Sequence, residues 1–141
     1  MKKKAILIIS IIILACLIFY AYPALEFLLN PDKVGGFYEP ITNTLYCNDE
    51  LYCWHEQGHK LDDEKGWVSN TKEYREALDI YLESYHGKKV KELIDWKSTI
   101  NLQRKVYMFF SYYKEMYATI YSVYGGRVEW MPEYLQEFYA E

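Results

Sequence analysis

The five residues from His55 to His59 have the pattern H-E-x-x-H, two imidazoles four positions apart with a carboxylate beside the first. On a helix that turns about 100° per residue, His55 and His59 lie within about 40° of each other, so both rings can reach one metal ion. Glu56 lies about 100° from His55 around the helix, where it could hold a water on that metal. The spacing predicts two zinc ligands, His55 and His59, and a general base, Glu56.

Asp62 lies roughly 20° from His55 around the same helix, one turn beyond His59. From there it could accept a hydrogen bond from the second nitrogen of a ligand imidazole. The alternative interpretation is a solvated helix turn with two idle histidines, since short motifs also arise by chance. The third histidine, His86, is interpreted as an exposed residue at a helix end.

Three stretches, Tyr38–Tyr46, His55–Asp63 and Ser69–Tyr74, together resemble the catalytic domain of the anthrax-lethal-factor-type zinc metallopeptidases. In that family an H-E-x-G-H-x-x-D helix follows an edge strand and is followed by a helix start led by serine. A later helix of the form E-aromatic-aromatic-A-E-x-aromatic supplies a glutamate as third ligand. The nearest match here is Glu115–Tyr121.

The resemblance implies that Glu115 is the third zinc ligand. Met116 stands where the family has an aromatic residue, and Thr119 stands where it has a second acid. A tyrosine upstream of the ligand glutamate assists the oxyanion in the family, and Tyr107 is the closest by position. The other candidates are Tyr112 and Tyr113 for the tyrosine, and Glu76, Glu83 and Glu92 for the ligand.

Three lysines, Lys2 to Lys4, precede an uncharged and largely apolar run from Ala5 to Tyr22. Eighteen helical residues reach roughly 27 Å, just enough to cross the hydrocarbon of a bilayer. The lysines predict a cytoplasmic N-terminus with the rest of the chain outside. No clear small-x-small cleavage site precedes Pro23, so a single-pass membrane anchor is favoured over a cleaved signal, which would give a secreted protein.

Residues 23–141 have the usual size of one domain. They contain 13 Lys and Arg against 20 Asp and Glu, a formal charge of −7. An acidic domain repels phosphate backbones, so no nucleic-acid partner is expected. Two cysteines, Cys47 and Cys53, flank the start of the metal helix. Outside the cell a disulfide between them is favoured, ahead of free buried thiols and of a structural zinc shared with the two histidines.

The predicted fold class is α+β and mostly helical, a minimal zincin-like domain with a small edge-strand sheet after one N-terminal transmembrane helix. The segment 37–46, which Pro40 interrupts, is expected as an edge strand that binds an extended peptide by strand addition, or as a covered sheet edge. Helices are predicted over 49–63, over 70–87, over 88–124 with a break near 98–101, and over 133–140.

Two apolar bands are expected to form the core. The first band runs along the second helix, which Asn70 is predicted to cap and Gly87 to end. It comprises Tyr74, Leu78, Tyr81, Leu82 and Tyr85. The second comprises Val106, Phe109, Phe110, Tyr113, Met116, Tyr117, Ile120 and Tyr124.

Taken together, the motif and the resemblance predict an outward-facing, membrane-anchored zinc metallopeptidase that cleaves a peptide or protein substrate. The rival hypothesis is a non-catalytic, membrane-tethered binding or immunity-type protein that keeps the zincin shape. The missing acid at Thr119 and the small domain favour that rival.

Overall fold

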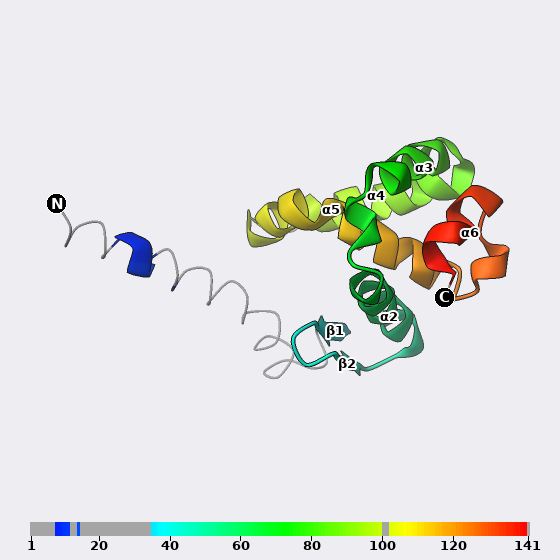
Figure 1. Ribbon diagram of the computed structural model, residues 1–141. Helices are drawn as coiled ribbons and strands as arrows, with labels where there is room; N and C mark the ends of the chain where they lie inside the picture. The colour runs from blue at the N-terminus through cyan, green and yellow to red at the C-terminus, as the bar shows by residue number, and fades with distance from the viewer. Residues whose placement is uncertain (1–7, 12–13, 15–34, 100–101, 141) are drawn as a thin grey trace.

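The computed structural model describes residues 8–11, 14, 35–99 and 102–140. Between residues 35 and 140 the described chain is mostly helical, with one small antiparallel sheet (Figure 1). This confirms the helical character and the small sheet expected from the sequence. In chain order the elements are β1 Gly36–Glu39, β2 Thr44–Cys47, α2 Glu50–Glu64, η1 Val68–Asn70, α3 Lys72–Glu83, α4 Tyr85–Thr99, α5 Leu102–Val123, η2 Val128–Trp130 and α6 Glu133–Tyr139.

The sheet is a two-stranded hairpin rather than one continuous strand. β1 pairs with β2 from Gly36 opposite Cys47 to Glu39 opposite Thr44. Pro40 lies in the turn between the strands, where its missing N–H interrupts no ladder. The predicted strand over 37–46 is therefore divided at Pro40.

A disulfide joins Cys47 to Cys53, with their Cα atoms 5.2 Å apart. It confirms the first of the three predicted states of these cysteines and excludes their sharing a zinc ion with the histidines. The bond ties the end of β2 to the first turn of α2, two residues before His55.

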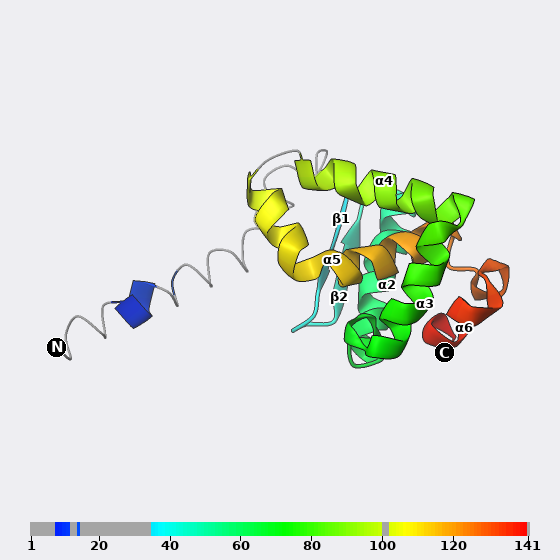
Figure 2. The ribbon, with the colours of Figure 1, turned by 90° about the horizontal axis from the view of Figure 1, so that it is seen from above.

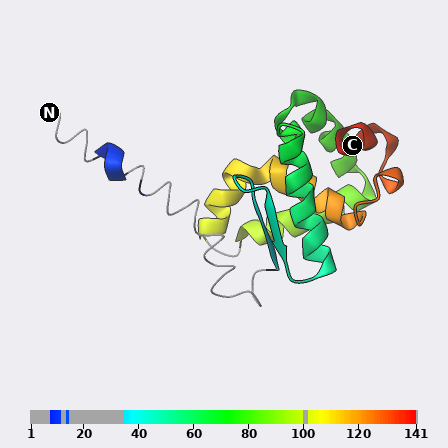
Figure 3. The same cartoon turned by 60° about the horizontal axis from the view of Figure 1, so that its bottom comes forward.

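Helix α2 lies between the hairpin on one side and α5 on the other (Figure 3). It begins after Asp49, whose side chain accepts a hydrogen bond from the backbone N–H of Tyr52. Its bounds agree with the predicted helix over 49–63 to within one residue. Because α2 packs against the hairpin and against α5, the helix that carries His55 and His59 is held between them.

The predicted start of the next helix at Asn70 is wrong. Asn70 closes the 3₁₀ helix η1, with its N–H bonded to the carbonyl of Trp67, and α3 begins at Lys72. The cap is Thr71, which has an extended backbone and whose hydroxyl accepts from the N–H of Tyr74. The tight turn that starts at Trp67, in the left-handed region, moves the helix start two residues along the chain.

The predicted end of that helix at Gly87 is also wrong. The chain breaks at Ser84, which has an extended backbone, and Gly87 belongs to the first turn of α4. A Cβ at position 87 would lie 1.9 Å from the carbonyl oxygen of Tyr81, so glycine allows the two helices to meet closely here. Tyr85 lies outside the core and is 74% exposed.

The core is rich in tyrosine and lies between α3, the second half of α5 and α6, with α4 alongside α5 (Figure 2). Its fully buried large side chains include Tyr74, Leu78, Tyr81, Met116, Tyr117, Ile120, Leu135 and Tyr139. The predicted second band is only partly right, because Phe109 and Phe110 are 82% and 76% exposed. These two residues lie in the first half of α5, which projects past the core in Figure 1.

The predicted membrane anchor, Ala5 to Tyr22, lies outside the described residues except for the helical residues 8–11 and residue 14. Within the described parts of the chain, no helix has both the length and the apolar character needed to cross a bilayer.

Candidate metal centre

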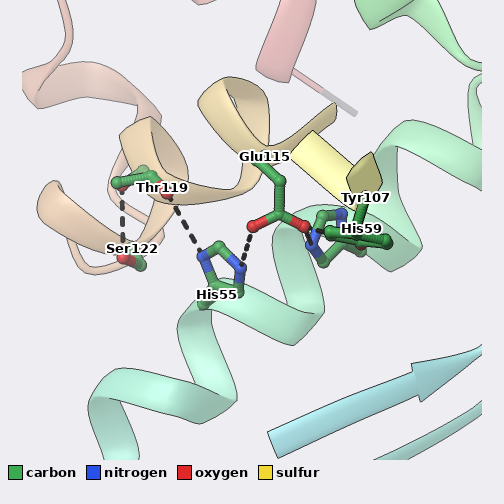
Figure 4. Close-up of polar contacts among 6 residues, drawn as sticks. All are labelled: His55, His59, Tyr107, Glu115, Thr119 and Ser122. Atoms are coloured by element: carbon green, nitrogen blue, oxygen red, sulfur yellow. Dashed lines mark hydrogen bonds and ion pairs between the residues drawn. The ribbon is translucent and has the colours of Figure 1, made fainter. Parts of the chain in front are cut away.

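Two helices bring together the three predicted ligands (Figure 4). His55 and His59 project from α2, and Glu115 projects from α5, which crosses it. Nε2 of His55 lies 3.4 Å from Oε2 of Glu115, and Nε2 of His59 lies 3.1 Å from Oε1. The two imidazoles are nearly perpendicular, with ring centroids 4.8 Å apart.

The three side chains could hold one metal ion, since one ligand atom from each lies within 4.8 Å of the others. Two tetrahedral ligands at zinc distances are separated by about 3.3 Å. The two separations between imidazole nitrogen and carboxylate oxygen, 3.4 Å and 3.1 Å, match this value. Two histidines and one glutamate are also a ligand set of catalytic zinc sites that keep a fourth position open.

The charges at this centre favour an ionised carboxylate facing the imidazoles. Burial acts to raise the pKa of Glu115, but the attraction and hydrogen bonds of His59 and His55 hold it well below its ordinary value. Burial acts to lower the pKa of His59, but the Glu115 carboxylate outweighs burial and raises it. The centre therefore has the negative charge that a metal cation needs, within a buried environment.

Glu56 lies beside the centre but outside the ligand group. It is 8% exposed, packs against β1 and accepts a hydrogen bond from the backbone N–H of Tyr38. Gly36 makes this packing possible, because a Cβ there would lie 2.6 Å from Cγ of Glu56. Burial raises the pKa of the Glu56 carboxyl above its ordinary value, despite the nearby histidines. A carboxylate with a raised pKa binds a proton more readily, as a general base requires.

The structure brings Tyr107 to the centre, where its hydroxyl donates to Oε1 of Glu115 over 2.8 Å. The Glu115 charge, with burial, raises the pKa of Tyr107 well above its ordinary value, so the hydroxyl stays protonated as a donor. The two alternative tyrosines lie elsewhere: Tyr112 lines a groove next to Ile94, and the Tyr113 ring stacks under the Arg75 guanidinium at 4.1 Å.

Thr119 contacts the outer nitrogen of His55. Its Oγ1 lies 3.5 Å from Nδ1 of His55, on the side of the ring away from Glu115, and the hydroxyl of Ser122 donates to its carbonyl (Figure 4). Position 119 is where the resembled family has an acid. From the sequence, Thr119 is interpreted only as the absence of that acid. The structure shows that its hydroxyl still reaches the His55 ring.

Asp62 does not make the hydrogen bond predicted for it. Both of its carboxylate oxygens accept from Ser69, one from the backbone N–H at 2.8 Å and one from the hydroxyl at 2.6 Å. Asp62 is fully buried and holds the end of α2 to η1. The serine of the resembled motif thus provides the partner of this aspartate, a pairing that residue spacing alone did not predict.

The remaining candidates lie outside the centre. The three alternative ligands form surface ion pairs with lysines: Glu76 with Lys72, Glu83 with Lys88 and Glu92 with Lys89. His86 is exposed near the start of α4, in accord with its interpretation from the sequence. Among the described residues, the only group found suitable for a metal ion is that of His55, His59 and Glu115.

No protein-family model, curated protein or solved structure matches this chain at the significance required of a relative. The residues of the site and their geometry are therefore the basis for inferring a function.

Proposed function

We propose that this chain is a zinc-dependent metalloendopeptidase, similar in its site to the lethal-factor-type enzymes. The observation that carries the proposal is the convergence of His55, His59 and Glu115, with Glu56 buried beside them and outside the ligand group. Glu56 is not one of the three ligands, so its burial beside them fits a group that acts on a water held by the metal.

In this proposal His55, His59 and Glu115 hold zinc. When bound, zinc supplies Lewis acidity that lowers the pKa of a water and polarises a peptide carbonyl. Glu56 would accept a proton from a water as its oxygen bonds to the peptide carbonyl carbon, and would return the proton to the amine released when the C–N bond breaks, a role that its raised pKa suits. The Tyr107 hydroxyl, which donates to Oε1 of Glu115 in the structure, would turn to donate a hydrogen bond to the carbonyl oxygen of the substrate.

The decisive experiment compares Glu56→Gln with Glu115→Gln in the full chain, purified without chelator. Glu56→Gln keeps the size and the metal ligands, so zinc content should stay at about one per chain while peptide cleavage falls about 100-fold or more. Glu115→Gln should lower zinc occupancy and cleavage together, and excess zinc should partly restore both. Glu64→Gln, at the exposed end of α2, is the matched control and should change neither.

Two results would contradict the proposal. Finding no zinc in the purified wild-type protein would disprove the proposed metal site. Cleavage by Glu56→Gln at the wild-type rate would disprove the proposed role of Glu56 as general base. Zinc binding by the wild type with no cleavage of any peptide in a library would favour the rival hypothesis, a non-catalytic binding or immunity-type protein. Thr119 supports that rival, because a hydroxyl at 3.5 Å orients an imidazole less firmly than a carboxylate would.

We also propose that the run from Ala5 to Tyr22 anchors the protein in the membrane with residues 23–141 outside. The support is the apolar run itself and the three lysines ahead of it. Protease added to intact cells should degrade the domain while the anchor remains in the membrane fraction. Complete protection of the domain would reverse the orientation, and release into the medium would show that the segment is cleaved.

A further inference from the structure

One part of the domain differs in charge from the rest. It is the α4–α5 arm, which we define as residues 88–99 and 102–110. Between Lys88 and Lys105 it has six Lys or Arg and only two Asp or Glu. Two of these lysines, Lys88 and Lys89, form ion pairs with Glu83 and Glu92, so the charge open to a partner comes from the remaining four basic residues. The remainder of residues 23–141 has seven basic residues against eighteen acidic ones. A basic segment in an otherwise acidic domain attracts an anionic partner.

The same arm exposes large apolar side chains. On α5 Phe109 and Phe110 are 82% and 76% exposed, with ring centroids 5.2 Å apart, and Val106 is 39% exposed. These three lie within about 100° around the helix, and exposed Lys105 borders them. Trp96 of α4 is 62% exposed. Phe109 and Phe110, adjacent and exposed on one side of α5, mark a candidate binding surface.

We propose that the α4–α5 arm docks onto the surface of a bilayer that contains anionic lipids. Aromatic side chains enter the boundary between headgroups and acyl chains, and the lysines contact the lipid phosphates. This combination of an apolar face with a basic border fits a lipid surface better than an extended peptide, which needs backbone partners.

The tether places such a surface within reach. Twelve residues separate Tyr22, the end of the proposed anchor, from Gly35, and even fully extended they span only about 40 Å. The nearness of the arm to the bilayer depends on the proposed anchor, whereas the docking itself does not depend on peptidase activity. Figures 1 and 2 show the first half of α5 extending past the core, so the arm can meet a flat surface before the core does.

Docking would set the orientation of the metal centre. Tyr107, at the centre, and Phe110, on the docking face, lie three residues and about one turn apart on α5. The site is then held close to the lipid headgroups. The substrates within its reach are proteins cleaved close to their membrane attachment.

The test uses the full chain in vesicles, with Cys16→Ser to leave the disulfide cysteines as the only native ones. Phe110→Cys carries an environment-sensitive fluorophore, and Ile80→Cys, at a position 61% exposed on α3, carries the same label as the control. In phosphatidylcholine mixed with phosphatidylglycerol, the label at 110 should shift to the blue and be quenched by lipids brominated in their acyl chains. The label at 80 should show neither effect.

Two variants test the charges and the aromatic face. Lys97→Gln with Lys105→Gln should lower the ratio of docked to undocked arm by about 30-fold, and vesicles of phosphatidylcholine alone should lower it at least as much. Phe109→Ser should weaken quenching of the label, whereas Lys72→Glu, a charge reversal on exposed α3, should not.

A label at 110 that stays in water in the mixed vesicles overturns the proposal. So does a blue shift without lipid quenching that vanishes when the protein is diluted in the bilayer, since a second copy of the chain then covers the arm. Alkaline washing separates the two inferences, because it strips the chain from vesicles if the anchor is wrong, while quenching reports on the arm in either case.

Discussion

Gly58 of α2 meets Ala118 of α5 so closely that a Cβ at position 58 would lie 2.7 Å from the Cα of Ala118. This contact sets the separation of the two helices that supply the ligands, since Gly58 lies between His55 and His59 in sequence and Ala118 follows Glu115 by three residues. The glycine inside the H-E-x-G-H pattern is therefore explained by helix packing.

Gly58→Ala is expected to force α2 and α5 apart. We predict a loss of about 1–3 kcal/mol in the free energy of unfolding, the usual cost of overpacking, despite the better helix propensity of alanine. Zinc affinity should fall as well, because Glu115 moves away from the imidazoles. Gln57→Ala, at an exposed neighbouring position, is the control for denaturant unfolding and zinc titration. Equal zinc affinity in the two variants would contradict this account.

Thr119 is expected to act through the ring of His55. An acceptor at Nδ1 favours the tautomer that leaves Nε2 free for the metal. Thr119→Val keeps the shape but removes the hydroxyl, so zinc affinity should fall about 10-fold, while Thr119→Ser should retain most of it. Competition with a chelator measures both affinities. Equal losses in the two variants would show that packing, and not the hydrogen bond, matters at this position.

The part of the site on α2 could be predicted because its residues are close together in the sequence. His55, Glu56 and His59 lie within one stretch of helix, so spacing alone defines their directions. Glu115 is 56 residues beyond His59, and only a resemblance pointed to it. Spacing places Asp62 on the predicted face of the helix but does not identify its partner. Both of its carboxylate oxygens accept hydrogen bonds from Ser69 instead of from a ligand imidazole.

The helix boundaries that failed depended on contacts between elements. The sequence pattern predicts a helix end at Gly87, but the glycine instead allows the first turn of α4 to approach the backbone of Tyr81 closely. Phe109 and Phe110 continue the helical apolar pattern of the core, but α5 extends beyond the elements that would cover them. Hydrophobic periodicity indicates which side chains share a face, and it does not indicate where the opposing surface ends.

The disulfide is expected to stabilise the domain and to hold the start of α2. Cross-linking residues six positions apart restricts the unfolded chain, which corresponds to about 2 kcal/mol in the loop-entropy treatment. Cys47→Ser with Cys53→Ser should lower the free energy of unfolding by about that amount. Hydrogen exchange should increase in the first turn of α2 more than in α3. Unchanged unfolding with and without reductant would show that the bond contributes little.

Zinc should stabilise the protein more as the pH rises. In metal-free protein the pKa of His59 is raised above 6.5, so its contribution to stability is complete below pH 6.5 and is lost as the pH rises through the folded value. The pKa of Glu115 lies well below 4.5, so its contribution is present above pH 4.5 and is lost only as the pH falls through that lower value. Stability from this pair is therefore greatest between about pH 4.5 and 6.5 in the absence of metal.

Zinc reverses this dependence because it binds the neutral imidazole and must displace the proton. While the imidazole is protonated, the apparent affinity for zinc should rise about tenfold per pH unit for each proton displaced. Thermal unfolding with and without excess zinc, between pH 5.5 and 8, should therefore show a difference in Tm that grows with pH. His59→Ala should abolish the difference, and His86→Ala, an exposed histidine outside the centre, should leave it intact. A zinc effect of constant size across this range would mean that the ion binds elsewhere on the chain.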